Sequence, residues 1–204
     1  MKGVKGLIQK VSATCAKNII SLGRLQEINE PVLRYGCELI LTSVIGLMIL
    51  ICLSLLIGHP LAWLFFVISF APHRISAGGY HADTHVICYI VTSLMFFLGA
   101  MTAYSFEWNW YAYLVVSVFS AILVIFLAPL AATNKPLSEK RFRSNRIRSI
   151  AVICMNIVIA VFFTVLNLEC EEVNMYYAGI FFASASLIMG KVKISVKGGK
   201  TNEG

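Results

Sequence analysis

The sequence has few charged residues for its length. Of its 204 residues, 13% are Asp, Glu, Lys or Arg and 58% are hydrophobic, whereas about a quarter of a typical soluble domain is charged. A single core of this size cannot hide so much apolar surface. We therefore expect a protein embedded in a lipid bilayer, which excludes a soluble enzyme or a soluble binding module.

Several familiar catalytic and targeting signatures are absent from the sequence. It has no His-Glu-x-x-His run, Gly-x-Ser-x-Gly elbow or phosphate-binding loop, which sets aside the enzyme classes that depend on them. Residues 1–30 contain no uninterrupted apolar core and no small-residue cleavage site. We therefore expect no cleavable signal peptide.

The cysteines also lack a recognisable pattern. None of them shows paired or metal-type spacing: Cys15, Cys37, Cys52, Cys88, Cys154 and Cys170. We therefore expect no metal site. In the topology derived below only Cys170 clearly faces an oxidising compartment, so a disulfide within the chain is not expected either.

Long apolar runs are what the sequence does have. They fall at about 39–57, 60–72, 86–104, 109–130, 150–168 and 174–190. A membrane-spanning helix needs roughly 20 apolar residues, with a range of about 17–25. Five runs reach that length. The second is short, so it either spans in a tilted or thinned arrangement or forms a re-entrant segment.

The distribution of Lys and Arg distinguishes these two arrangements. If the short run spans, the loops at 58–60, 105–108 and 169–173 share one side and contain no Lys or Arg, while all 17 basic residues lie on the other side. A re-entrant run would place the basic stretch 135–148 opposite the basic N-terminus. By the positive-inside rule we predict six spans with both termini in the cytoplasm.

The predicted fold is all-α and forms one membrane domain over residues 1–204. Residues 39–190 form the six-span bundle with a short second helix, and 191–204 form a flexible basic tail. Residues 1–30 form an amphipathic helix at the cytoplasmic interface, which lies on lipid or packs on the protein's own cytoplasmic face. The net charge of +7 reflects this topology, so we expect no nucleic-acid partner.

The most polar passage beside a span covers residues 72–88 and contains an Arg, three His, an Asp and a Cys. The Gly78–Gly79 pair permits a tight turn or a close approach of another segment. Asp83 or Thr84 suits the N-cap of the third span. Cys88 then lies in the first turns of that helix, where the partial positive charge of a helix N-terminus favours a nucleophilic thiolate.

Two histidines are candidates for the base that would activate Cys88. His85 precedes it by three residues and shares its helical face. His81 precedes it by seven residues, a rise of about 10.5 Å on a continuous helix, so it reaches Cys88 only if the helix begins later and the loop folds back. The spacing leaves both open. A packing cysteine beside interfacial histidines is the non-catalytic reading.

Two motifs resemble those of the accessory gene regulator B (AgrB) family of bacterial membrane peptidases. The first is Arg74-x-x-x-Gly78-Gly79-x-His81-Ala82 followed by Cys88. The second runs from Ala128-Pro129-Leu130 to the passage 134–140 and a basic stretch. The resemblance covers nearly the whole chain, including its length, six apolar segments and amphipathic N-terminus.

This resemblance implies a cysteine endopeptidase of the bacterial plasma membrane that processes the quorum-sensing propeptide AgrD. Cys88 would be the nucleophile and His81 the general base. The acyl-enzyme thioester would be resolved by a thiol or hydroxyl of the bound peptide, which closes a thiolactone or lactone ring without a cofactor. Family behaviour also implies a homodimer.

Other residues are candidates for supporting roles. Arg74 would bind a carboxylate or the oxyanion, or act only as a positive-inside anchor, and Asp83 is expected to cap a helix. The basic loop sets topology or docks acidic propeptide residues through Lys135, Lys140, Arg141 and Arg143. The alternatives to an enzyme are a small transporter or exporter subunit and a structural subunit.

Overall fold

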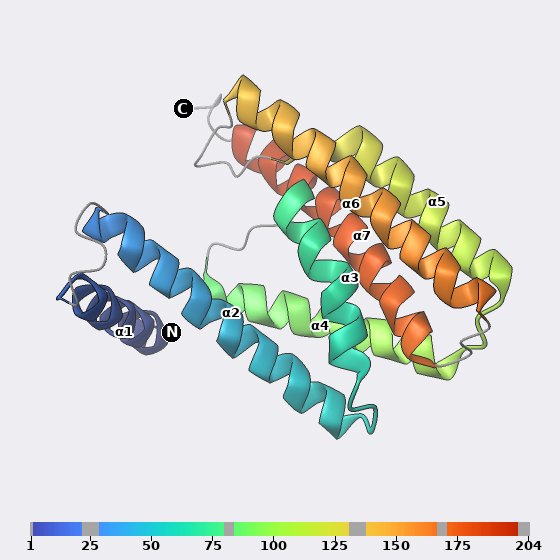
Figure 1. Ribbon diagram of the computed structural model, residues 1–204, viewed down its shortest axis with the longest axis horizontal. Helices are drawn as coiled ribbons and strands as arrows, with labels where there is room; N and C mark the ends of the chain where they lie inside the picture. Colours follow the sequence, from blue (N-terminus) through green and yellow to red (C-terminus); the bar gives the residue numbers. More distant parts are fainter. Residues whose placement is uncertain (1, 22–28, 80–83, 131–137, 167–170, 200–204) are drawn as a thin grey trace.

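The computed structural model describes residues 2–21, 29–79, 84–130, 138–166 and 171–199. All regular structure within these ranges is helical (Figure 1): α1 (Lys2–Ser21), α2 (Glu30–Leu56), α3 (Ala62–Ala77), α4 (His85–Ser105), α5 (Trp110–Leu127), α6 (Glu139–Val165) and α7 (Glu171–Gly199). The prediction of an all-α multi-pass membrane protein is confirmed.

Five of the described helices are long and apolar enough to cross a bilayer: α2, α4, α5, α6 and α7. The remaining apolar run forms α3, which has 16 residues and is about 24 Å long at the usual rise per residue. That is shorter than a hydrocarbon core of about 30 Å. A sixth crossing, and the side on which each terminus lies, therefore stay predictions.

Several helices extend beyond their apolar runs because a helix can continue into the polar interface with its backbone hydrogen bonds intact. α6 begins at Glu139, although the apolar run begins at about residue 150. α7 continues to Gly199, so residues 191–199, which we expected in a flexible tail, are helical. Residues 200–204 lie outside the described part of the chain.

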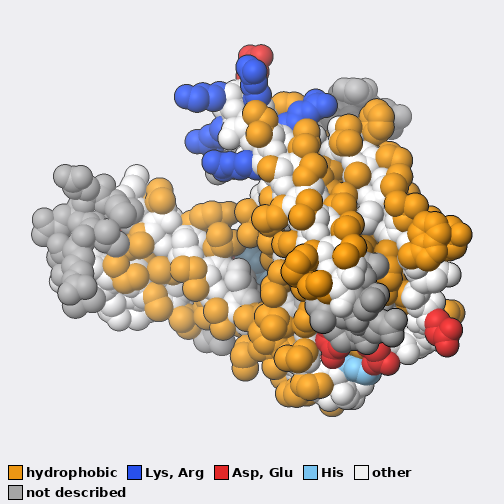
Figure 2. All heavy atoms as spheres, turned by 45° about the vertical axis from the view of Figure 1, so that its right-hand side comes forward, with side chains coloured by type: hydrophobic (Ala, Val, Ile, Leu, Met, Phe, Trp, Pro, Cys, Tyr) orange, Lys and Arg blue, Asp and Glu red, His pale blue; other side chains and the backbone are white. Residues whose placement is uncertain are grey.

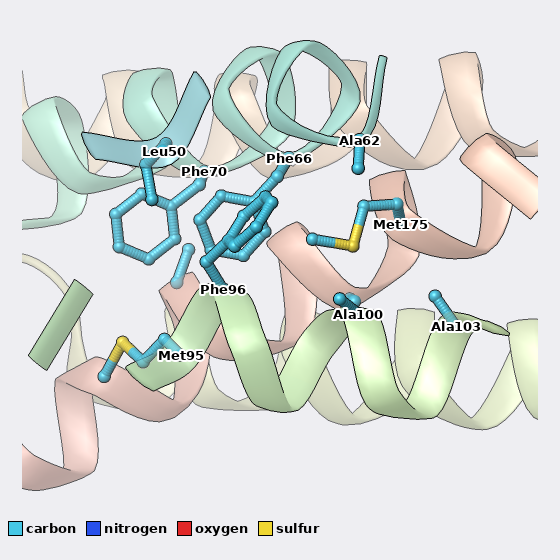
Figure 3. Close-up of a cluster of buried hydrophobic side chains, with 11 residues drawn as sticks. Leu50, Ala62, Phe66, Phe70, Met95, Phe96, Ala100, Ala103 and Met175 are labelled. Atoms are coloured by element: carbon cyan, nitrogen blue, oxygen red, sulfur yellow. The ribbon is translucent and has the colours of Figure 1, made fainter. Parts of the chain in front are cut away.

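α7 is the central helix of the bundle. It contacts α3, α4, α5 and α6, and Figure 1 shows α5, α6 and α7 running side by side with α3 crossing α7. The apolar side chains form two clusters, one on each side of the α3–α7 contact. The first, drawn in Figure 3, joins α2, α3, α4 and α7 and includes Leu50, Phe66, Phe96 and Met175.

The second cluster joins α3, α5, α6 and α7 and includes Ala77, Val124, Ile153, Tyr176 and Leu187. Many apolar side chains outside both clusters are exposed, and they cover the flanks of the bundle in Figure 2. A surface of this kind is expected to face lipid, because lipid chains are as apolar as these side chains.

Helices α3 and α7 approach each other closely because small residues line their contact. A Cβ added to Gly179 would collide with Ser69 Oγ and would lie 2.9 Å from the Phe66 carbonyl oxygen. Asn156 of α6 joins the same contact: its Nδ2 donates to the Ser69 carbonyl at 3.3 Å, and its Oδ1 accepts from the Tyr176 hydroxyl at 2.8 Å. Small residues and interhelical hydrogen bonds of this type hold membrane helices together.

The N-terminal helix α1 packs on the protein itself. Among the α1 side chains that the structure describes, the buried ones are Ile8, Ser12 and Ala16, which recur every four residues and face α2. Figure 1 shows α1 beside the first half of α2 and away from α5–α7. Val11 and Cys15 are exposed, so this arrangement is compatible with a lipid interface on the other face of α1.

The close α3–α7 approach predicts a sharp response to one added methyl group. Gly179→Ala should destabilise the protein by about 1–3 kcal/mol, because either Ser69 or the helices must move. Gly36→Ala in α2 is the matched control: no atom lies within 4 Å of the added Cβ, and alanine favours a helix. Thermal unfolding in detergent micelles measures both, and an equal Tm for the two variants would contradict the proposed packing role.

Candidate active site

Cys88 lies in the first turn of α4, and the sequence explains why that helix begins where it does. Thr84 is the N-cap: its Oγ1 accepts a hydrogen bond from the Ile87 amide at 3.3 Å. The Cys88 amide donates to the Thr84 carbonyl at 3.2 Å. Of the two predicted caps, Thr84 is therefore the one used, and Asp83 lies outside the described residues. The helix N-terminus directs its partial positive charge toward this region.

The Cys88 side chain is half-buried and faces α3. It lines a narrow pocket together with one aromatic, one cationic and three other side chains of α3 and α4, the full lining being Phe70, Arg74, Cys88, Val91, Thr92 and Met95. Apolar walls on both sides of a thiol limit access of water. A nucleophile in such a place would be partly shielded.

Arg74 comes from the last turn of α3 and lies on the same side of α4 as the Cys88 side chain. Its Nη1 donates to Ser186 Oγ of α7 at 3.1 Å, and its charge interacts electrostatically with Cys88. A guanidinium in this position is able to stabilise an oxyanion that forms nearby. The structure thus brings together two residues that the sequence separates by fourteen positions.

The Gly78–Gly79 pair ends α3 in a conformation that other residues rarely adopt, with φ angles of 79° and 127°. A Cβ on Gly78 would lie 2.5 Å from the Leu130 carbonyl oxygen. A Cβ on Gly79 would lie 2.5 Å from Ser186 Oγ and 2.9 Å from Arg74 Nη1. Both glycines are therefore required by conformation and by space.

The second sequence motif meets the first at this point. The Leu130 amide, at the end of the Ala128-Pro129-Leu130 passage, donates to the Ala77 carbonyl at 3.0 Å. A Cβ on Gly190 of α7 would lie 2.8 Å from the carbonyl carbon of Gly79 and 3.1 Å from Leu130 Cδ1. The turn that leads toward His81 is therefore packed against both α7 and the segment after α5.

Sequence reasoning missed Ser186 and Gly190, which complete this arrangement from α7. The signal that would have indicated them is the series of small residues on α7, namely Gly179, Ala183, Ser186 and Gly190. Such a series is typical of closely packed membrane helices. The series indicates which face of α7 packs closely on other helices, but it does not indicate which residue contacts Arg74.

The structure describes only one of the two candidate bases. His81 lies outside the described residues, so its position stays a prediction. His85 is described, and its Nε2 lies 3.1 Å from Oε1 of Glu38 on α2. His85 therefore faces α2, whereas Cys88 lines a pocket against α3. Although the two residues are three positions apart on one helix, they are directed toward different neighbours.

The third histidine of residues 72–88 contacts α7. His73 is fully buried, and its Nε2 lies 3.2 Å from Ser184 Oγ of α7. It therefore belongs to the α3–α7 packing. Among the described residues no group of three His, Cys, Asp or Glu side chains could hold a metal ion.

The predicted docking residues lie at the start of α6. Lys140, Arg141 and Arg143 are exposed there, and Figure 2 shows Lys and Arg side chains gathered at one end of the molecule. Arg146 and Arg148 are exposed on the same helix, while Lys135 lies outside the described residues. The same end of the bundle holds the C-terminal part of α7.

The tight contact around Gly78 gives a prediction with a closely matched control. Gly58 has nearly the same φ, 81° against 79°, but nothing lies within 4 Å of a Cβ added to it. Both alanine variants incur strain at a positive φ, and only Gly78→Ala also meets the Leu130 oxygen, so it should lower stability by about 1–3 kcal/mol more than Gly58→Ala. Thermal unfolding in micelles tests this, and equal losses would show that the Leu130 contact is unimportant.

The chain was compared with known proteins. The family model described as "Accessory gene regulator B" matches residues 7–189. Accessory gene regulator protein B of Staphylococcus intermedius is 25% identical over 127 residues, which cover 62% of this chain and 68% of that protein. A putative AgrB-like protein of Halalkalibacterium halodurans is 23% identical over 201 residues, covering 97% and 98% of the two chains.

A putative AgrB-like protein of Clostridium acetobutylicum is 24% identical over 161 residues, covering 79% of this chain and 77% of that protein. No solved structure matches the chain significantly. The family match extends over most of the chain, including α3, α4 and the Gly78–Gly79 turn between them. This chain therefore belongs to the accessory gene regulator B family.

Proposed function

We propose that this chain is a membrane-embedded cysteine endopeptidase that processes an AgrD-like quorum-sensing propeptide. It would cleave off the C-terminal part of the propeptide through an acyl-enzyme thioester and promote ring closure of the product to a thiolactone or lactone. One observation carries the proposal. Cys88 occupies the first turn of a capped helix and faces a cation, Arg74, across a narrow apolar pocket.

The chemistry follows from that placement. The Cys88 sulfur attacks the carbonyl carbon of the scissile peptide bond, and Arg74 stabilises the negative charge that develops. The tetrahedral intermediate collapses, the C–N bond breaks, and the departing amine takes a proton from the histidine that accepted the thiol proton. The C-terminal piece leaves with a free amine, and the rest remains bound to Cys88 as a thioester.

Ring closure uses the energy kept in that thioester. A thiol or hydroxyl within the bound peptide attacks the thioester carbonyl, and the Cys88 thiol is released. The internal nucleophile has a high effective concentration, and a pocket with little water disfavours hydrolysis. The step needs no nucleotide and no metal.

The proposed base is His81, and the position of His85 supports this choice. The His85 imidazole is engaged by Glu38 on the side of α4 that faces α2, whereas a base for Cys88 must come within about 2.6–3.2 Å of the sulfur or act through a water. His81 belongs to the segment that follows the Gly78–Gly79 turn and precedes the Thr84 cap. The sequence distance between His81 and Cys88 is therefore not a distance along one helix.

The exposed basic start of α6 suits recognition of an acidic segment of the propeptide. Its described charges are spread over nine residues and are solvent-accessible: Lys140, Arg141, Arg143, Arg146 and Arg148. Complementary charge accelerates encounter and fixes register more than it raises affinity. A homodimer in the bacterial plasma membrane is part of the same proposal.

The rival function, a non-catalytic transporter or exporter subunit, has less support. Transport paths are usually marked by ionisable groups along the membrane interior. The Lys and Arg side chains visible in Figure 2 gather instead at one end, and Arg74 is at the C-terminal end of α3 beside Cys88. A transporter would also tolerate the loss of the Cys88 thiol.

Loss of the thiol provides the decisive test. Cys88→Ala should abolish cleavage when this chain is co-expressed with an AgrD-like propeptide, because no thioester can form. Cys154→Ala, at an exposed position of α6, should keep full activity. Mass spectrometry should find the N-terminal propeptide fragment attached to Cys88 in the active protein. Cleavage by folded Cys88→Ala would overturn the proposal.

Neutralising the start of α6 tests the docking role separately. Arg141→Gln combined with Arg143→Gln should raise the KM for the propeptide by about threefold to tenfold and leave kcat nearly unchanged, and the effect should shrink at high salt. Lys17→Gln combined with Arg34→Gln removes the same charge from exposed positions of α1 and α2. If both double variants raise the KM equally, the charges at the start of α6 act only through the electrostatic field of the whole protein and not as a docking site.

A further inference from the structure

Glu38 is the least expected polar residue of the described bundle. It lies on α2 at the point where the apolar run begins, and its side chain is 21% exposed. A carboxylate held largely out of water beside a membrane is costly unless it is paired. Its described partner is His85, the first residue of α4.

This pair is the first of a series of contacts that join α2 to α4. One turn further along each helix, the Tyr89 hydroxyl donates to the Thr42 carbonyl at 3.1 Å. After another turn of α2, Gly46 lies against the Tyr89 ring: a Cβ added to Gly46 would be 3.5 Å from the nearest ring atom. The contacts recur every four residues, so one stripe of each helix faces the other.

The series directs the first turns of α4 toward α2, while its later turns pack on α7. Successive helical residues are turned by about 100°, so the third residue after His85 projects about 60° away from it around the helix. That residue is Cys88. When His85 is directed toward α2, Cys88 is directed toward α3, where Arg74 lies.

A polar pair in this place supplies specificity more than strength. Two apolar side chains would hold α2 and α4 together about as well, but they would tolerate a range of rotations. A carboxylate and an imidazole keep their hydrogen bond in only a narrow range of helix rotations. The N-cap at Thr84 fixes where α4 begins, and the Glu38 contact fixes the direction in which its first turn faces.

We propose that Glu38 is a positioning residue for the nucleophile: it holds His85, and through it the first turn of α4, in the rotation that directs the Cys88 sulfur toward Arg74. The inference rests on the proposed cysteine-peptidase function and extends it to a residue of α2 that touches neither substrate nor sulfur. It also gives His85 a structural role distinct from that of a general base.

The experiment uses the full-length protein in a background that keeps Cys88 and replaces the other cysteines by serine. Glu38→Ala removes the contact. The exchange variant Glu38→His with His85→Glu restores an equivalent pair in the opposite order, and Glu30→Ala removes an exposed carboxylate from the first turn of the same helix. Cleavage of an AgrD-like propeptide gives kcat and KM. Alkylation of Cys88 by N-ethylmaleimide without propeptide reports the thiol independently of turnover.

For Glu38→Ala we expect kcat to fall by about tenfold or more with KM within about twofold, because a misplacement of about 1 Å is enough for such a loss. Alkylation should become faster by about threefold, since a loosened first turn exposes a half-buried thiol. The exchange variant should recover kcat to within about threefold and return the alkylation rate to that of the protein with Glu38 and His85 in place, and Glu30→Ala should change neither. Faster alkylation together with a lower kcat would mean that the Cys88 thiol is accessible but wrongly placed for catalysis.

Three outcomes would overturn the inference: an unchanged kcat in Glu38→Ala, an unchanged alkylation rate, or an exchange variant that folds and is not rescued. The last would also restore His85 as a candidate base. If Glu38→Ala does not fold, Glu38→Gln keeps a carbonyl acceptor for His85 and should retain activity within about threefold, whereas Glu38→Leu should not. Failure of the peptidase proposal itself is seen separately as cleavage by Cys88→Ala, and the alkylation rates still decide whether Glu38 positions the thiol.

Discussion

The contact between α3 and α7 is the constraint on which the rest of the bundle depends. In a bilayer, apolar surface alone does not drive helices together, so close approach of backbones and a few interhelical hydrogen bonds must do so. Gly179 permits that approach, and Asn156 and Ser184 supply polar contacts along it. Both apolar clusters are built outward from the two faces of this helix pair.

The candidate site is a consequence of the same contact. Arg74 is held by Ser186, and the Gly78–Gly79 turn passes between α7 and Leu130 at distances that leave no room for a side chain. α4 also packs on α7, and its first turns contact α2 through Glu38 and Thr42. The thiol and the cation that faces it are thus supplied by α4 and α3, two helices that both pack on α7.

Much of this could be predicted from the sequence because it is local. Apolar runs indicate the membrane helices, a Thr before a helix indicates its cap, and a Gly pair indicates a tight turn. Ser186 and Glu38 could not be predicted in the same way, because their partners are 112 and 47 residues away. The short length of α3 leaves the count of six crossings a prediction, and the choice of His81 as base came from the family resemblance, since the spacing left both histidines open.

The shortness of α3 has a consequence for the lipid around the site. A helix of 16 residues is about 6 Å shorter than the hydrocarbon core it would have to cross. If α3 crosses the bilayer, its exposed flank, which includes Ile75 at 84%, meets lipid that must thin around it or leave one end of the helix below the interface. In either case the depth at which Arg74 and Cys88 sit is set jointly by the protein and by the thickness of the surrounding membrane, so the lipid is itself a component of the site.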